Sequence, residues 1–335
     1  MNDVQLAGQM NQMISGYWTS QAVYAAAKLG LADLVATGPR SIDDLAAATG
    51  AVPDRLFRML RALASVGVFT ETAPRIFGLT PLAELLRSDA PQSQRSLAIM
   101  MGEEHYFVWG QLLDMVRSEE NAFEKLHGLP IFDFLGKHPE KGRVFDEAMT
   151  GIHGRETAAV IAAYDFSDIG MLADVGGGNG SKITAILQHF PKLRGMLFDL
   201  PHVVDRAEPR LRDAGVLDRC QLQRGNFFES VPAGADAYLM RHIIHDWNDE
   251  QSLTILRNCQ RAMQPGQRLL LVESVIPPGN GAFHTKFLDL TMMLIPGGRE
   301  RTEEEYRQLY DQAGFELRRI VPTSTEISII EGVRR

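Results

Sequence analysis

The sequence predicts an α/β protein in which a doubly wound, mostly parallel sheet follows a mainly helical domain. The chain has 335 residues, about twice the ~150 residues typical of one domain. Helical hydrophobic patterns dominate residues 81–163, whereas short apolar runs alternate with helical stretches after Asp165, as in a sheet with crossover helices. We therefore expect a helical domain over residues 1–160 and an α/β domain over residues 161–335.

The N-terminal segment predicts an amphipathic helix rather than a signal peptide or a membrane span. Residues 4–27 carry no charge, but four Gln and one Asn interrupt any continuous apolar stretch. Bulky apolar side chains fall at helical spacing instead; they are Met10, Met13, Ile14, Tyr17, Trp18 and Tyr24. Either the core of this chain or a second subunit must cover that stripe.

Residues 41–79 predict two helices and a hairpin. Ser41 is expected to cap a short helix that stops at Gly50, and a second helix and a two-stranded hairpin follow. This order is typical of a winged-helix module, which raises the alternative of a DNA-binding regulator. Residues 40–95 hold seven arginines against six acids, however, too small an excess for a basic nucleic-acid footprint.

Five short apolar runs predict the strands of the second domain. They cover residues 171–175, 195–198, 220–224, 235–240 and 268–272, and helices start near Ser181, Val203 and Asp249 between them. The apolar content of these runs predicts strands that are buried on both faces of the sheet.

A glycine-rich turn over residues 176–180 follows the first of these strands. Its glycines let bare main chain approach a ligand closely. Ser181 stands where a dinucleotide fingerprint needs glycine, and no Lys-Ser/Thr pair follows as in a phosphate-binding loop. Asp174 suits a positively charged ligand beside the turn, and Asp199, at the end of the second strand, suits the hydroxyls of a ribose.

Five motifs follow one another in the second domain. They are Asp-Val-Gly-Gly-Gly-Asn-Gly at 174–180, Phe-Asp-Leu-Pro at 198–201, Gly-Asn-Phe-Phe at 225–228, His-Asp-Trp-Asn-Asp at 245–249 and Gly-Gly-Arg-Glu-Arg-Thr at 297–302. Together they resemble the S-adenosylmethionine-dependent small-molecule O-methyltransferases. That family includes the plant caffeic acid and flavonoid enzymes, hydroxyindole O-methyltransferase, and bacterial phenazine and polyketide O-methyltransferases.

The resemblance covers nearly the whole chain. It implies a Rossmann-like methyltransferase domain behind a dimerisation domain of winged-helix type, and a homodimer. It further implies methyl transfer from S-adenosylmethionine to a hydroxyl of a small aromatic acceptor, with S-adenosylhomocysteine as product and no metal.

His245 is the predicted general base. It follows the fourth strand, at the sheet edge where doubly wound folds bind ligands, and an in-line methyl displacement needs a group that accepts the hydroxyl proton. The resemblance adds Glu273 and Glu300 as the acids that flank it, although the residues alone also fit an exposed strand-end acid and a solvated helix start. His242 precedes His245 at a spacing that metal ligands use, but no third histidine matches, and we expect a core or capping role.

The predicted cofactor-binding residues come from the turn and from the ends of neighbouring strands. They are Asp174, Gly176, Gly178, Asp199, Leu200, Asn226, Phe227 and Arg241. Asn226 stands where the family usually has an acid that accepts from the adenine amino group, and it can accept only through an uncharged oxygen. Arg241 replaces a common lysine, and Phe227 is expected to cover the adenine face.

The acceptor pocket is predicted from flexible and aromatic side chains that suit a flat ring. These are Trp109, Phe145, Met149 and Met292, each of which could instead belong to the core. The sequence does not predict which acceptor is used. N-methylation and a non-methylating reaction stay open, since an amine depends less on a base.

Charge and cysteine content narrow the partners and the compartment. With 34 basic and 42 acidic residues the net charge is -8, which gives no bulk attraction to nucleic acid or to anionic membranes. Two cysteines in so long a chain fit a reducing cytoplasm better than secretion. We expect a cytoplasmic protein that binds neither nucleic acid nor membrane.

Overall fold

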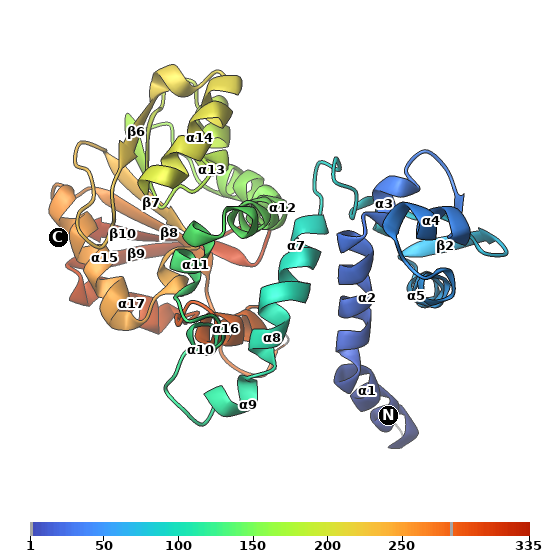
Figure 1. Ribbon diagram of the computed structural model, residues 1–335. Coiled ribbons are helices and arrows are strands. Elements are labelled where there is room, and N and C mark those ends of the chain that lie inside the picture. The colour runs from blue at the N-terminus through green and yellow to red at the C-terminus, as the bar shows by residue number, and fades with distance from the viewer. Residues whose placement is uncertain (1–2, 282–283) are drawn as a thin grey trace. The chain divides into compact units, whose positions relative to one another are not determined.

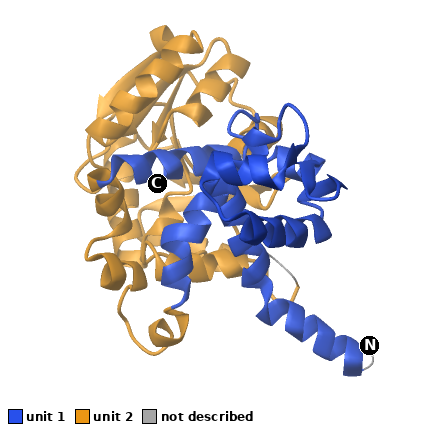
Figure 2. Ribbon diagram, turned by 45° about the vertical axis from the view of Figure 1, so that its right-hand side comes forward, with its two compact units in different colours: residues 1–110, 138–152 blue, residues 111–137, 153–335 orange. Residues whose placement is uncertain are grey.

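A computed structural model describes residues 3–281 and 284–335, and the chain forms two compact units (Figures 1 and 2). The first unit comprises Met1–Gly110 and His138–Ile152, and the second comprises Gln111–Lys137 and His153–Arg335. This division differs from the predicted boundary at residue 160, because residues 111–137 belong to the second unit. The domain boundary itself stays a prediction.

The first unit is mainly helical, as predicted. Its helices are α1 (Asp3–Ile14), α2 (Gly16–Lys28), α3 (Leu31–Leu34), α4 (Ile42–Thr49), α5 (Pro53–Ser65), α6 (Pro81–Glu84), α7 (Arg95–Met100), the π-helix η1 (Met101–His105) and α8 (Tyr106–Trp109), with the first part of α12 (Pro139–Ala163). A small sheet has the order β1-β3-β2, with bounds Arg40–Ser41, Ile76–Leu79 and Phe69–Ala73. Ser41 caps α4 by accepting from the Asp44 N–H at 3.1 Å, and Gly50 ends it at a φ of 71°. Both predictions are confirmed, and the winged-helix assignment stays a prediction.

The predicted N-terminal helix consists of two helices, α1 and α2, on either side of Ser15. No side chain of α1 is buried, and Met13 and Trp18 are 67% and 66% exposed. Within residues 3–281 and 284–335, therefore, no core covers their part of the apolar stripe. A second subunit remains as the predicted cover.

The second unit contains a seven-stranded sheet with the order β6-β5-β4-β7-β8-β10-β9. The strands are β4 (Met171–Val175), β5 (Arg194–Asp199), β6 (Cys220–Arg224), β7 (Ala237–Arg241), β8 (Arg268–Ser274), β9 (Phe315–Pro322) and β10 (Ile327–Arg334). The five predicted strands are confirmed and pair in parallel. The antiparallel strands β9 and β10 were not predicted.

Helices cover both faces of this sheet. The helices of the unit are α9 (Leu112–Met115), α10 (Ala122–His127), α11 (Ile131–Lys137), the rest of α12, α13 (Ser181–His189), α14 (Pro201–Asp213), α15 (Asp249–Ala262), α16 (Thr285–Leu294), α17 (Glu303–Gln312), and the short turns η2 (Leu217–Arg219) and η3 (Ile244–Asp246). One core cluster joins the sheet to α12, α13 and α14, and the other joins it to α15 and α17. Because the strand order reverses between β4 and β7, their carboxyl ends mark the switch point where such sheets bind ligands.

No helix in the described part of the chain is long and apolar enough to cross a membrane.

Candidate active site

The glycine turn joins β4 to α13 and has two different faces. Gly176 and Gly178 have φ values of 67° and 58°, in the left-handed region that side chains disfavour. A Cβ atom on Gly176 would lie 2.4 Å from Cδ1 of Ile243, whereas one on Gly178 would meet nothing within 4 Å. The turn is therefore closed against the segment after β7 and open at Gly178.

Asp199 ties the end of β5 to this turn. Its Oδ2 accepts from the Gly178 N–H at 2.8 Å, and its Oδ1 accepts from the Leu200 N–H at 2.7 Å. Burial raises the pKa of Asp199, although these two backbone donors oppose the effect. Each carboxylate oxygen keeps a further lone pair, so Asp199 can still accept from a ligand hydroxyl beside Gly178.

Asp174 lies at the end of β4 and is fully buried. The sequence led us to expect a positively charged ligand here, and the structure places an ammonium of this chain beside it. The Nζ atom of Lys182 lies 2.6 Å from Oδ1 of Asp174. Lys182 follows the turn on α13 and was not singled out in the sequence.

Asn226 and Phe227 follow β6. Oδ1 of Asn226 accepts from the Phe228 N–H at 3.0 Å, so this oxygen holds the local turn and keeps one lone pair for a ligand. The Phe227 ring packs edge-on against Trp247, with centroids 6.1 Å apart. Cε1 of Phe227 would lie 3.6 Å from a Cβ atom on Gly176, so the Phe227 ring lies beside the turn.

His245 lies on η3, just after β7, between two buried carboxylates. Its Nδ1 is 2.7 Å from Oε1 of Glu300 and 3.7 Å from Oε2 of Glu273. The exposed fractions of Glu273 and Glu300 are 0% and 2%, so the interpretation of either as a solvated acid is wrong. Because Glu300 is an acceptor, we assign the Nδ1 proton to this hydrogen bond, which leaves Nε2 for other chemistry.

The two carboxylates change the acidity of His245. Burial by itself lowers the pKa of the imidazole, but the charges of Glu273, Glu300 and Asp246 outweigh it and raise the pKa to about 10; Oδ1 of Asp246 lies 3.6 Å from Nε2. Burial also raises the pKa of Glu273 to about 7. Oε1 of Glu273 meanwhile accepts from the N–H groups of Ile243 and Ile244, both at 3.0 Å. Glu273 therefore orients both the imidazole and the backbone that carries it.

His242 is partly buried beside His245 in a left-handed conformation, with φ at 53°. Its Nε2 lies 2.9 Å from Oε2 of Glu156, and its Nδ1 lies 3.7 Å from Oε2 of Glu273. Burial and the neighbouring charges of His245 and Arg241 hold its pKa well below the usual value. The side chain thus links α12 to the carboxylate that flanks His245.

A metal ion has a possible set of ligands in this cluster. His242, His245 and Glu273 each offer one atom, and these atoms lie within 4.8 Å of one another. The predicted absence of a metal therefore stays a prediction.

Arg241 ends β7 next to His242. Its Nη1 donates to Oγ1 of Thr157 on α12 at 2.6 Å. Burial lowers its pKa, against the attraction of Glu156, Asp174 and Glu273. The guanidinium therefore interacts with three acids, Glu156, Asp174 and Glu273, near the switch point of the sheet.

Two residues of the Gly-Gly-Arg-Glu-Arg-Thr motif hold the loop of His245, and neither was predicted. Arg301 is 1% exposed and donates to the carbonyl oxygens of Ile244 and Trp247, both at 3.0 Å. A Cβ atom on Gly298 would lie 2.0 Å from the carbonyl oxygen of His245. Both residues belong to a motif that is visible in the sequence, but only the fold shows that they contact the backbone of η3.

The four predicted acceptor residues do not all belong to one compact unit. Trp109, Phe145 and Met149 lie in the first unit, on α8 and α12, and Met292 lies on α16 in the second. Their joint role stays a prediction.

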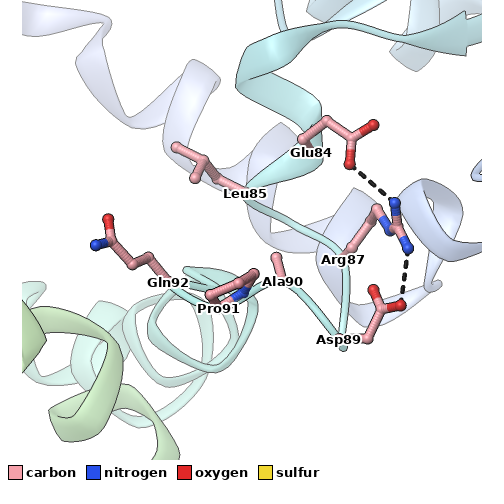
Figure 3. Close-up of a pocket in the computed structure, with 7 residues that line it drawn as sticks. All are labelled: Glu84, Leu85, Arg87, Asp89, Ala90, Pro91 and Gln92. Carbon is pink, nitrogen blue, oxygen red and sulfur yellow. Dashed lines mark hydrogen bonds and ion pairs between the residues drawn. The ribbon is translucent and has the colours of Figure 1, made fainter.

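A surface pocket of about 400 Å³ occurs in the first unit between α6 and α7 (Figure 3) and includes none of the predicted residues. Within it, Arg87 pairs with Glu84 at 3.0 Å and with Asp89 at 2.7 Å.

Comparison with known proteins identifies the family. Residues 109–316 match the model of the O-methyltransferase domain, and residues 11–89 match that of the O-methyltransferase dimerisation domain. The chain belongs to the O-methyltransferase family.

Similar proteins support the family across the whole chain. This O-methyltransferase is 50% identical to phenazine O-methyltransferase PhzM of Lysobacter antibioticus, over 98% of this chain and 96% of that relative. The crystal structure of LaPhzM matches with a TM-score of 0.96 at 49% identity, covering 98% of this chain and 99% of the other. NcsB1 from neocarzinostatin biosynthesis, solved with S-adenosylmethionine and 2-hydroxy-5-methyl naphthoic acid, matches with a TM-score of 0.85 at 33% identity, covering 95% and 96%.

Proposed function

We propose that this O-methyltransferase moves the methyl group of S-adenosylmethionine to a hydroxyl of a small aromatic acceptor of phenolic, phenazine or polyketide type, with His245 as the general base. The observation that carries the proposal is the pair of buried acids around His245, Glu300 at 2.7 Å and Glu273 at 3.7 Å. The segment that holds His245 contacts the glycine turn through Ile243. Base and proposed cofactor site therefore share one edge of the sheet.

The residues around the turn fit S-adenosylmethionine. Space is open over Gly178, Asp199 has lone pairs beside it for ribose hydroxyls, and Phe227 offers a ring face for adenine. When bound, the cofactor supplies a methyl group on a positively charged sulfur. Leu200, Asn226 and Arg241 complete the proposed site.

The raised pKa of His245 eases removal of the acceptor proton. A phenol near pKa ~10 would lose its proton to an ordinary imidazole near ~6.5 only uphill, by roughly 5 kcal/mol at 1.36 kcal/mol per unit. Because its carboxylate neighbours raise the pKa of His245, the transfer to this imidazole is less uphill. The same raised pKa keeps His245 protonated in more of the free enzyme at neutral pH, so the rate is expected to rise with pH.

The chain is proposed to act as a homodimer through its first unit. The match to a dimerisation domain and the exposed stripe around Met13 and Trp18 support this. Trp109, Phe145, Met149 and Met292 are the proposed acceptor contacts, and the cytoplasm is the proposed location.

The experiment is incubation with S-adenosylmethionine carrying a labelled methyl group and a panel of phenols, phenazines and aromatic polyketides. The panel includes, for each hydroxylated ring, the matching amine and the matching compound without either group. Label on the hydroxyl compounds alone supports the proposal. Label only on amines would assign N-methylation instead, and conversion without label transfer would assign a non-methylating reaction.

A further inference from the structure

A buried ion pair lies directly beneath the glycine turn. Asp174 and Lys182 have side-chain exposures of 0% and 5%, and Nζ and Oδ1 are 2.6 Å apart. A Cβ atom on Gly177 would lie 3.1 Å from the carboxylate carbon of Asp174, so this carboxylate supports the turn from below. The pair is therefore part of the proposed cofactor site rather than of the outer surface.

The carboxylate of Asp174 still has acceptor capacity. The Lys182 ammonium pairs with Oδ1 at 2.6 Å, whereas Oδ2 accepts no hydrogen bond from any described residue. A buried acceptor without a hydrogen bond is costly. Such an acceptor beside an open turn favours a ligand that donates to it.

Burial disfavours the charged form of Lys182, which depends on its carboxylate neighbours. Burial lowers its pKa, and Asp174 and Glu273 oppose this effect while the guanidinium of Arg241 adds to it. S-adenosylmethionine carries an ammonium on its amino-acid end, as does S-adenosylhomocysteine. With the cofactor at the turn, its ammonium and that of Lys182 would share the carboxylate of Asp174.

We propose that Lys182 is a specificity-determining residue whose ammonium competes with the ammonium of the cofactor for Asp174. This competition weakens the binding of the amino-acid end of the cofactor and of the product. Binding of the nucleoside end is unaffected. This inference rests on the proposed function, because it requires S-adenosylmethionine at the turn.

The test compares two ligands that differ in the group concerned. S-adenosylhomocysteine carries the ammonium, and 5′-methylthioadenosine keeps the nucleoside and thioether without it. Calorimetry on the full-length protein should show K182M binding S-adenosylhomocysteine about tenfold or more tightly than wild type, the factor of a charge-assisted hydrogen bond. The affinity for 5′-methylthioadenosine should change by less than about twofold. K192M, which removes an exposed lysine beyond the end of α13, is the matched control and should change neither affinity.

A double variant assigns the effect to Asp174. D174N/K182M removes both charges, so the gain in affinity for S-adenosylhomocysteine should disappear. An unchanged or weaker affinity in K182M, an equal gain for both ligands, or a gain that persists in the double variant would overturn the inference. If K182M does not fold, K182Q takes its place with the same expectation.

Wild-type behaviour separates this inference from the proposed function. Wild-type protein that binds neither ligand would contradict the proposed function itself. Wild-type protein that binds both, with no selective gain in the Lys182 variant, contradicts only the competition.

Discussion

Replacement of Glu300 by glutamine should lower the pKa of His245. The glutamine keeps an oxygen for the Nδ1 proton but removes the charge 2.7 Å away. A neighbouring carboxylate shifts a pKa by about one to three units. From about 10 in the wild type, the pKa of His245 should therefore fall to between about 7 and 9.

The assay is an NMR titration of protein labelled at its nine histidines. The resonance of His245 is the one missing from H245Q. E303Q, which removes an exposed acid of the neighbouring helix, is the matched control and should leave this titration unchanged.

Kinetics should follow the titration. The pH at which kcat/KM stops rising should move down in E300Q by the same one to three units, and the limiting rate should fall because the weaker base accepts the phenolic proton less readily. A wild-type His245 that titrates near 6.5, or an E300Q protein that titrates like wild type, would refute the reasoning.

Four other outcomes are expected. H245A should lower kcat about a hundredfold or more while calorimetry gives nearly unchanged affinity for S-adenosylhomocysteine; full activity would remove it as the base. G178V should abolish that binding because its side chain fills the open side of the turn, whereas G215V, at a similar φ of 69° with open space around it, should bind normally. Deletion of residues 1–25 should give a monomer by light scattering, and an unchanged mass would count against the proposed interface. The folded pKa of His245 lies above its ordinary value of 6.5. The pairing of the charged imidazole therefore stabilises the fold fully below pH 6.5, and this stabilisation is lost as pH rises toward 10. Over this range the melting temperature of the wild type should fall more than that of E300Q, and parallel curves would argue against the pairing.

The sequence predicted the parallel part of the sheet well, because buried parallel strands are continuous apolar runs between helical patterns. It did not predict β9 and β10. In β9, the edge strand, the charged residues Arg318 and Arg319 interrupt the run. β10 lies between β8 and β9 and pairs antiparallel with both, an arrangement that local patterns do not encode.

Part of the site was predicted from the sequence. The remaining site residues could not be predicted, because they act through contacts with residues far away in the chain. His245 followed from its place after a strand, whereas Glu273 and Glu300 came from the family resemblance. Lys182 was not singled out in the sequence, and only the fold brings its ammonium to Asp174. Arg301 likewise reaches main-chain oxygens more than 50 positions away, which no local pattern encodes.

The most direct test of the central claim is a crystal structure of the protein grown with S-adenosylhomocysteine. The claim predicts the product over the turn at Gly178, with its ribose hydroxyls bonded to Asp199 and its sulfur on the side that Nε2 of His245 faces. Product bound away from the turn, or with the sulfur turned away from His245, would contradict it.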